Sequence, residues 1–220
     1  YTTTAGQFRV AIGTEALYTA SHVANNGSIA IGHQSLKAKN LGSGLSLDGA
    51  TVAIGYNALT AMTAATGNTA IGHKAGAALI SGGSNTIVGF EAMSTSADNG
   101  NGANTAIGYQ AMKGVNVGST GDSNVAIGSG ALYGGTSTGQ NNVVIGAAAC
   151  DNASSAQDDS VIIGSGACDA ALTAGADGTI AIGTTALAAL TSGAGNIAIG
   201  YKALFTEDDG NKCVAIGYEA

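Results

Sequence analysis

Seven aromatic or imidazole side chains recur at one position of a repeated motif, directly after the glycine that closes a short apolar string such as Ala-Ile-Gly. A ring offers apolar area beside a polar tip, so a row of such rings could form a ladder on which sugars stack. The alternative, which we favour, is a packing ladder within or between chains. These residues are His33, Tyr56, His73, Phe90, Tyr109, Tyr201 and Tyr218.

Two of the three cysteines, Cys150 and Cys168, occupy the same motif position in successive repeats, where most other repeats carry Leu or Met. Stacked strands would place their Cα atoms about one strand spacing apart, which a disulfide permits. Because they replace Leu, we favour reduced thiols that fill a core, since a free cysteine behaves as a small hydrophobe. The third, Cys213, completes no zinc-ligand spacing.

Acidic residues cluster in two segments between motifs, Asp158-Asp159 and Glu207-Asp208-Asp209. Their carboxylate oxygens could contribute to a Ca²⁺ site. The alternative is solvated charge in turns, which also opposes side-by-side aggregation of open sheet edges. We favour solvated charge and expect neither a metal nor a cofactor.

Sequence motifs of enzymes are absent: the chain has no nucleophile elbow, phosphate loop, zinc-binding helix, dinucleotide fingerprint or EF-hand loop. The histidines His22, His33 and His73 have no acid or nucleophile at a spacing typical of a catalytic site. A pair of carboxylates that cleaves glycans could assemble only across repeats. The sequence therefore predicts a protein that is not an enzyme.

The positions of these residues depend on a repeat that occurs twelve times, with 17 to 23 residues between successive motif glycines. Ile or Val precedes the glycine, Ala stands two places before it in nine repeats, and Ala or Ser stands three places after it. Asn stands four places before it in six repeats. The glycines are Gly13, Gly32, Gly55, Gly72, Gly89, Gly108, Gly128, Gly146, Gly164, Gly183, Gly200 and Gly217.

Each motif predicts a short strand, because β-branched residues alternate with Ala and turn-forming residues flank the string. In the segment 196–200, Ile197 and Ile199 would share one face of the strand and Ala198 the other. We expect the Ile face to be buried and the Ala face to meet solvent or a close-packed neighbour. A short helix after the glycine, for example over 184–190, is the alternative.

Stacked repeats of this length predict an all-β solenoid over residues 1–220, with about twelve coils in a rod about 58 Å long. The composition agrees, since 36 glycines suit corners and the lack of proline keeps every ladder hydrogen bond. Missing proline excludes collagen, scarce charge excludes a coiled coil, and 45% hydrophobic residues argue against disorder.

The net charge of −7, with scattered basic residues, argues against nucleic-acid binding, and no apolar run is long enough to insert into a membrane. One coil encloses a thin core, so we expect the Ala-lined face to pack against other copies of the chain. Ice binding by a flat Thr array is disfavoured, because Thr precedes the glycine by three places only at Thr69, Thr86 and Thr105.

The string Val-Ala-Ile-Gly-x-x-Ala-Leu, in versions such as residues 104–112, resembles the repeats of bacteriophage tail fibre shafts. It is similar also to the β-roll in the heads of trimeric autotransporter adhesins. Variable spacing and the strings Tyr109–Ala111 and Tyr201–Ala203 favour the phage version, because adhesin repeats are shorter and more uniform. The resemblance covers essentially the whole chain and implies a parallel homotrimeric fibre.

The resemblance also implies a function, a rigid shaft of a virion tail fibre that presents or spaces a host-receptor-binding element. The partners would be two further copies of the chain and a cell-surface glycan or protein receptor. The alternative is a bacterial adhesin head or an extracellular filament subunit at the cell surface. We expect the chain to be an excerpt of a longer protein, and the longest insertion, Lys37 to Thr51, to form a projecting loop.

Overall fold

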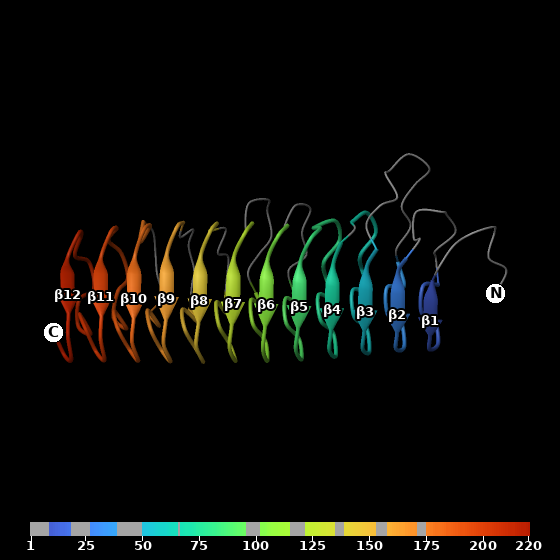
Figure 1. Cartoon of the computed structure of the whole chain (residues 1–220), viewed down its shortest axis with the longest axis horizontal. Coiled ribbons are helices and arrows are strands. Elements are labelled where there is room, and N and C mark those ends of the chain that lie inside the picture. Colours follow the sequence, from blue (N-terminus) through green and yellow to red (C-terminus); the bar gives the residue numbers. More distant parts are fainter. Residues whose placement is uncertain are drawn as a thin grey trace.

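The computed structural model describes residues 9–18, 27–38, 50–65, 67–95, 102–114, 122–134, 139–152, 158–170 and 175–220. Twelve three-residue strands form one parallel sheet in sequence order, and the described residues contain no helix. The strands stack along the axis of a rod (Figure 1). They are β1 Val10–Ile12, β2 Ile29–Ile31, β3 Val52–Ile54, β4 Thr69–Ile71, β5 Thr86–Val88, β6 Thr105–Ile107, β7 Val125–Ile127, β8 Val143–Ile145, β9 Val161–Ile163, β10 Ile180–Ile182, β11 Ile197–Ile199 and β12 Val214–Ile216.

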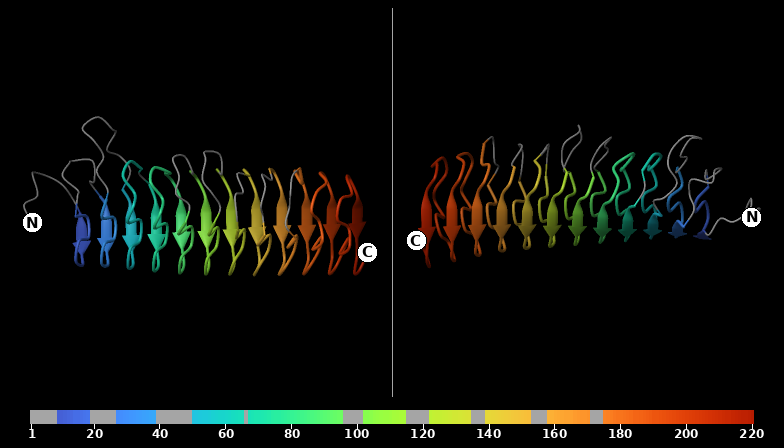
Figure 2. Two further views of the ribbon diagram at one scale, coloured as in Figure 1. Left: turned by 180° about the vertical axis from the view of Figure 1, so that it is seen from behind. Right: turned by 45° about the horizontal axis from the view of Figure 1, so that its top comes forward.

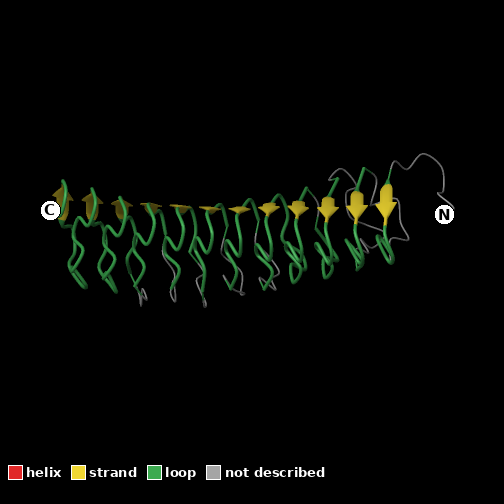
Figure 3. Ribbon diagram, turned by 90° about the horizontal axis from the view of Figure 1, so that it is seen from below, coloured by secondary structure: helices red, strands yellow, loops and turns green. Residues whose placement is uncertain are grey.

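The register of the sheet places each motif directly over the next. Ala181 of β10 pairs with Ala198 of β11, and Ile182 pairs with Ile199. The predicted all-β solenoid with one strand for each repeat is thereby confirmed. The view from behind shows the same single row of strands as Figure 1 (Figure 2), and the view from below places the strands on one side of the rod and the connecting segments on the other (Figure 3). Seen from below, the strands turn progressively from one end of the rod to the other (Figure 3), the twist usual for a sheet.

The motif glycine makes the corner that follows each strand. Gly55 has φ 136°, and a Cβ on it would overlap the carbonyl group of Gly72 in the next repeat. Glycine is therefore required at this corner both for its conformation and for the close approach of neighbouring backbones.

The segment after the corner, which we call the arm, is a series of consecutive turn residues. Thr185 and Leu187 have φ values of 55° and 51°, in the left-handed region, and the equivalent residues of other repeats agree. Right-handed helix cannot continue through such residues, so the alternative of a helix over 184–190 is wrong. Backbone bonds join the arms of successive repeats, as when Leu59 N donates to Ala75 O at 3.0 Å.

The orientation of the strands corrects the expected burial. The middle residue of the strand points into the solenoid, where Ala53 and Ala198 are fully buried, whereas the flanking Ile197 and Ile199 are half-buried on the outer face. The interior position of the strand is Ala in nine repeats, and the arm supplies Leu or Met to the same core in most of them, so a small strand residue accompanies a large arm residue. The expectation of a buried Ile face and an outward Ala face is therefore wrong.

Asparagine forms a second internal ladder at the residue before the strand. Asn124 N donates to Asn104 Oδ1 at 2.9 Å, and Asn142 N donates to Asn124 Oδ1 at 2.9 Å. Asn124 Nδ2 donates to Gly139 O at 2.9 Å. Ser160 and Thr179 continue the position, both buried. The ladder satisfies backbone groups that would otherwise be buried without partners.

Candidate functional site

The corner row, defined as the residue that follows each motif glycine, carries the predicted aromatic ladder. Its side chains lie at the surface of the rod, directly after the corner made by each motif glycine. Tyr56, Phe90 and Tyr109 are 46%, 45% and 53% exposed. In chain order the row is Thr14, His33, Tyr56, His73, Phe90, Tyr109, Ser129, Ala147, Ser165, Thr184, Tyr201 and Tyr218.

Five of the seven predicted rings form one continuous stack. Their centroids lie 5.2 Å apart from His33 to Tyr56 and from Tyr56 to His73, 4.8 Å from His73 to Phe90, and 5.6 Å from Phe90 to Tyr109. The ring planes are within 13° of parallel. We call this stack the aromatic column.

The other two predicted rings form a separate pair. Tyr201 and Tyr218 stack at 5.1 Å, and Lys202 Nζ lies 5.2 Å from the centre of the Tyr201 ring. Four repeats with small corner residues separate this pair from the aromatic column. The structure therefore assembles the seven residues into two groups rather than one ladder.

Stacking decides what the rings can contact. Within the aromatic column, both faces of Tyr56, His73 and Phe90 are covered by neighbouring rings, so only their edges meet solvent. Sugar stacking needs an open ring face. Stacking of a sugar, which was expected for the whole corner row, is thus possible only at a ring with one uncovered face.

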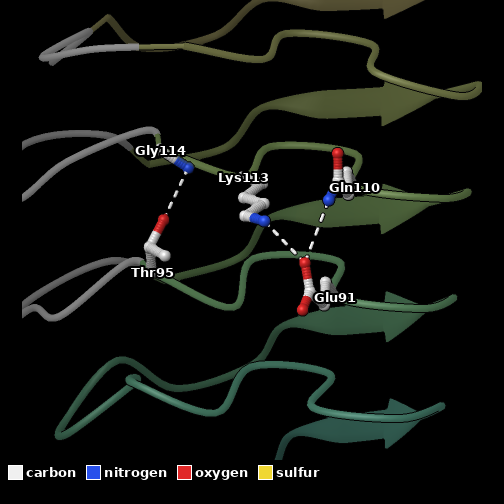
Figure 4. Close-up of polar contacts among 5 residues, drawn as sticks. All are labelled: Glu91, Thr95, Gln110, Lys113 and Gly114. Carbon is white, nitrogen blue, oxygen red and sulfur yellow. Dashed lines mark hydrogen bonds and ion pairs between the residues drawn. The ribbon is translucent and has the colours of Figure 1, made fainter.

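Polar residues form a network beside the column that the sequence analysis did not identify. Glu91 Oε2 accepts hydrogen bonds from Gln110 Nε2 at 2.9 Å and from Lys113 Nζ at 2.5 Å (Figure 4). The bond from Lys113, followed by that from Gln110, lowers the pKa of the Glu91 carboxyl and the partnership raises the pKa of Lys113. A bond from Gly114 N to Thr95 Oγ1 at 2.8 Å joins the same two repeats.

The same network occurs a second time, at the N-terminal end of the described rod. Glu15 Oε2 accepts from Gln34 Nε2 at 2.6 Å and lies 2.7 Å from Lys37 Nζ. The hydrogen bonds from Lys37 and then Gln34 lower the pKa of Glu15. A sequence signal exists: Glu two places after one motif glycine is followed, in the next repeat, by Gln at that place and Lys three residues later.

A carboxyl pair lies next to the cysteines and was also missed. Asp151 and Asp169 follow Cys150 and Cys168 in successive repeats. Burial, then a hydrogen bond with Asp169 and its charge, raises the pKa of Asp151 to about 6. Asp169 Oδ1 is buried without a hydrogen-bond partner. The signal available was the shared repeat position of the two residues.

The cysteine interpretation is confirmed. Cys150 and Cys168 form no disulfide and are 0% and 1% exposed, within the apolar core. Burial, followed by the neighbouring Cys150 and Asp169, raises the pKa of Cys168, which keeps the thiol protonated. Cys213 is half-buried and also forms no disulfide.

The acidic segments behave differently from each other. Asp158 Oδ1 accepts from Gln140 N at 2.8 Å and Asp159 Oδ1 from Asn141 Nδ2 at 3.0 Å, so both carboxylates join neighbouring repeats. The carboxylates of Glu207, Asp208 and Asp209 lie within 4.8 Å of one another. They are the cluster that could hold a cation among the described residues, and they lie mostly in solvent.

Two predictions fall at least partly outside the described residues. His22 lies outside them, as do residues 39–49 of the predicted projecting loop from Lys37 to Thr51.

No helix among the described residues is long and apolar enough to cross a membrane.

Comparison with known proteins gave no match, whether with family models, with curated proteins or with solved structures.

Proposed function

We propose that this chain is a structural and adhesive fibre segment, the rigid shaft of a phage tail fibre, which presents or spaces an element that binds a host receptor. The functional unit is a parallel homotrimer located in the virion. The resemblance of the repeats to phage shafts supports the assignment, and the straight solenoid of stacked strands supplies the stiffness.

The outer face of the sheet is the observation that carries the proposal. Each strand directs its first and third residues outward, and all of these are Val or Ile except for Thr69, Thr86 and Thr105. No charged residue occurs at any of these positions. Ile71 in β4 is 39% exposed, and Ile12 and Ile216 in the end strands β1 and β12 are 58% and 68% exposed.

Such a face needs a partner. Contiguous apolar patches larger than a few hundred Å² mark interaction sites on soluble proteins. Twelve strands spaced about 4.8 Å apart give a face about 50 Å long. That length is sufficient for about 800 Å² per chain, the area of a standard interface. The β-branched face, rather than the Ala-lined face, is therefore where three chains meet.

Molecular mass in solution tests the proposal. Multi-angle light scattering on the purified chain should give three times 21.0 kDa. Ile127→Lys combined with Ile163→Lys places two charges on the outer face and should give a monomer with a lower melting temperature. The control, Ser129→Lys with Ser165→Lys, adds the same charges to the exposed corner row and should remain trimeric. A monomeric wild-type chain contradicts the homotrimer.

Electron microscopy of the native particle tests the location. A phage shaft should label with antibody along tail fibres, at a fixed distance from the tip. Label on bacterial cells in place of virions would instead support the alternative of an adhesin or filament subunit.

A further inference from the structure

Tyr109 is the last ring of the aromatic column, and only one of its faces stacks on another ring. Its inner face stacks on Phe90, but the next residue of the corner row is Ser129, which has no ring. Tyr109 is 53% exposed, more than Tyr56 or Phe90, which have both faces covered. A flat apolar surface therefore faces along the rod toward the C-terminal repeats.

Beyond Tyr109, two rows of residues carry only small side chains over four repeats, a region that we call the step. Its corner row is small, and so is the row of residues one place later, which elsewhere carries long polar side chains such as Gln110 and Lys202. The two rows of the step are Ser129, Ala147, Ser165 and Thr184, and Gly130, Ala148, Gly166 and Thr185.

The backbone does not impose these small residues. Gly130 has φ 64°, close to the 54° of Gln110 and Lys202, so other repeats carry long side chains in the same conformation. A Cβ on Gly130 would meet nothing within 4 Å. Larger side chains would fit at the step, yet both rows are small across the same four repeats.

The chemistry at the step narrows the class of ligand. An open tyrosine face is followed by the exposed hydroxyl-bearing residues Ser129, Ser165 and Thr184, and neither row of the step carries a charge. A nucleic acid would need basic residues for its phosphates. A sugar ring presents apolar C–H groups on one face and hydroxyls at its edge, which suits an aromatic face beside hydroxyl groups.

We propose that the step binds a neutral linear glycan, with one sugar ring stacked on the open face of Tyr109. Five repeat spacings of about 4.8 Å separate Tyr109 from Tyr201, so the step is about 24 Å long and accommodates several sugar units. Tyr201 is a poorer platform, because Tyr218 covers one face and the Lys202 ammonium lies over the ring. The proposal goes beyond the shaft function, which requires no ligand.

Titration with oligosaccharides tests the site. Linear oligomers of glucose, N-acetylglucosamine, galactose and mannose, each long enough to span the step, are added at millimolar concentration to the purified chain. Tyrosine ring resonances in NMR spectra and calorimetry report binding. We expect saturable binding of at least one oligomer, with the Tyr109 resonances shifted most.

Two variants distinguish stacking on Tyr109 from other modes of oligosaccharide binding. Tyr109→Ala removes the platform, whereas Ser129→Phe extends the aromatic column and covers the open face while keeping Tyr109. Both should weaken binding at least about tenfold. Tyr56→Ala, a ring inside the column with similar exposure, should change affinity less than about twofold.

The outcomes are decisive in each direction. Absence of binding by all four oligomers overturns the proposal, as does undiminished binding to Ser129→Phe with a wild-type melting temperature. If Tyr109→Ala does not fold, the affinity of Ser129→Phe for the oligosaccharides still tests the proposal. Oligomer mass is measured separately, so a failed homotrimer is distinguished from a failed glycan site.

Discussion

At the scale of single residues, a small side chain in the core compensates for a large one in a neighbouring repeat. A Cβ added to Gly76 would lie 3.0 Å from Ile87 Cδ1 and 2.7 Å from Leu59 Cδ2, so the missing side chain makes room for Ile87 where most repeats have Ala. The equivalent positions one repeat apart pair Cys150 with Ile162, again a residue smaller than Leu beside a strand residue larger than Ala. Cys150 is therefore a size-matched core residue.

Cys150→Leu tests this exchange. The added volume meets Ile162 in a close-packed interior and should lower the free energy of unfolding by about 1–3 kcal/mol, measured by chemical denaturation. Ile162→Ala added to Cys150→Leu restores the Ala and Leu combination of most other repeats and should recover most of the loss. Equal stability of the single variant and wild type would contradict the size match.

Stability should also depend on pH through Asp151. Its pKa of about 6 exceeds the ordinary 3.8, so the folded chain holds this proton more tightly than the unfolded chain. The resulting stabilisation is complete below about pH 4 and is lost as the pH rises through 6. Solvent screening at this half-exposed site limits the effect to about 1 kcal/mol.

Melting temperatures at pH 4 and pH 7.5 check this dependence. Asp151→Asn removes the titrating carboxyl and leaves an amide that can donate to Asp169, so its melting temperature should fall less than that of wild type between the two values. Asp169→Asn should act in the same way, because either substitution removes the pair. Identical pH dependence in wild type and both variants would show that the pair is not coupled.

At the scale of elements, each strand is too short to persist alone and depends on ladders that continue through the stack. The asparagine ladder supplies the bonds at the start of the strand, where backbone groups of the arm and the next repeat are buried. Asn124 accepts from Asn142 N and from Asn142 Nδ2, and donates to Gly139 O. One side chain therefore serves three groups.

Asn124→Leu should lower the free energy of unfolding by about 2–3 kcal/mol, because it leaves buried polar groups without partners. Asn124→Ser is the matched variant, since Ser160 occupies the same position and its Oγ accepts from Thr179 N at 3.2 Å. The serine variant should lose less than the leucine variant in urea denaturation. A leucine variant as stable as wild type would mean that the ladder contributes little.

The repeat made most of the fold predictable. The glycines gave the strand positions, and the strands lie where the motif predicts them, in register. Which side chains of the strand point into the solenoid was not predictable from alternation alone. Ile would suit a wide interior and Ala a narrow one, and the sequence does not show how close strand and arm lie. In the structure, Ala198 is the residue that points inward. The left-handed turn at Thr185 and Leu187 was likewise unforeseen, since Leu and Thr rarely adopt it.

The candidate site was predictable only in part. The motif placed the rings in one row, but the break between Tyr109 and Tyr201 acquires meaning only once stacking shows which faces are covered. The pair Asp151 and Asp169 and the network around Glu91 depend on contacts between repeats. Such contacts follow from counting positions after the glycine, provided that the stacking register is known.

At the scale of the whole molecule, stability is distributed along one axis, since each repeat contacts only its neighbours. Removing one complete repeat should therefore shorten the rod without destroying it. Deletion of residues 125–142 joins Asn124 directly to Val143 and preserves the motif register. We expect a folded chain with unchanged β content per residue by circular dichroism.

The matched control is deletion of residues 125–133, which removes half a repeat and disrupts the register. This chain should lose cooperative unfolding or aggregate, because the following strands can no longer stack in phase. If both deletions behave alike, the rod is not built from independent repeats.

The parallel order of the strands has a mechanical consequence. Hydrogen bonds between repeats run along the rod, so a pull on its two ends puts the full force on each interface between repeats, and the interfaces can open one after another. Each repeat that detaches from a single chain releases 17 to 23 residues, or roughly 60 Å of slack at about 3.3 Å per residue. One chain alone would yield as a sequence of small extensions. Bundling with other chains along the outer face would convert the same rod from an extensible tether into a stiff lever.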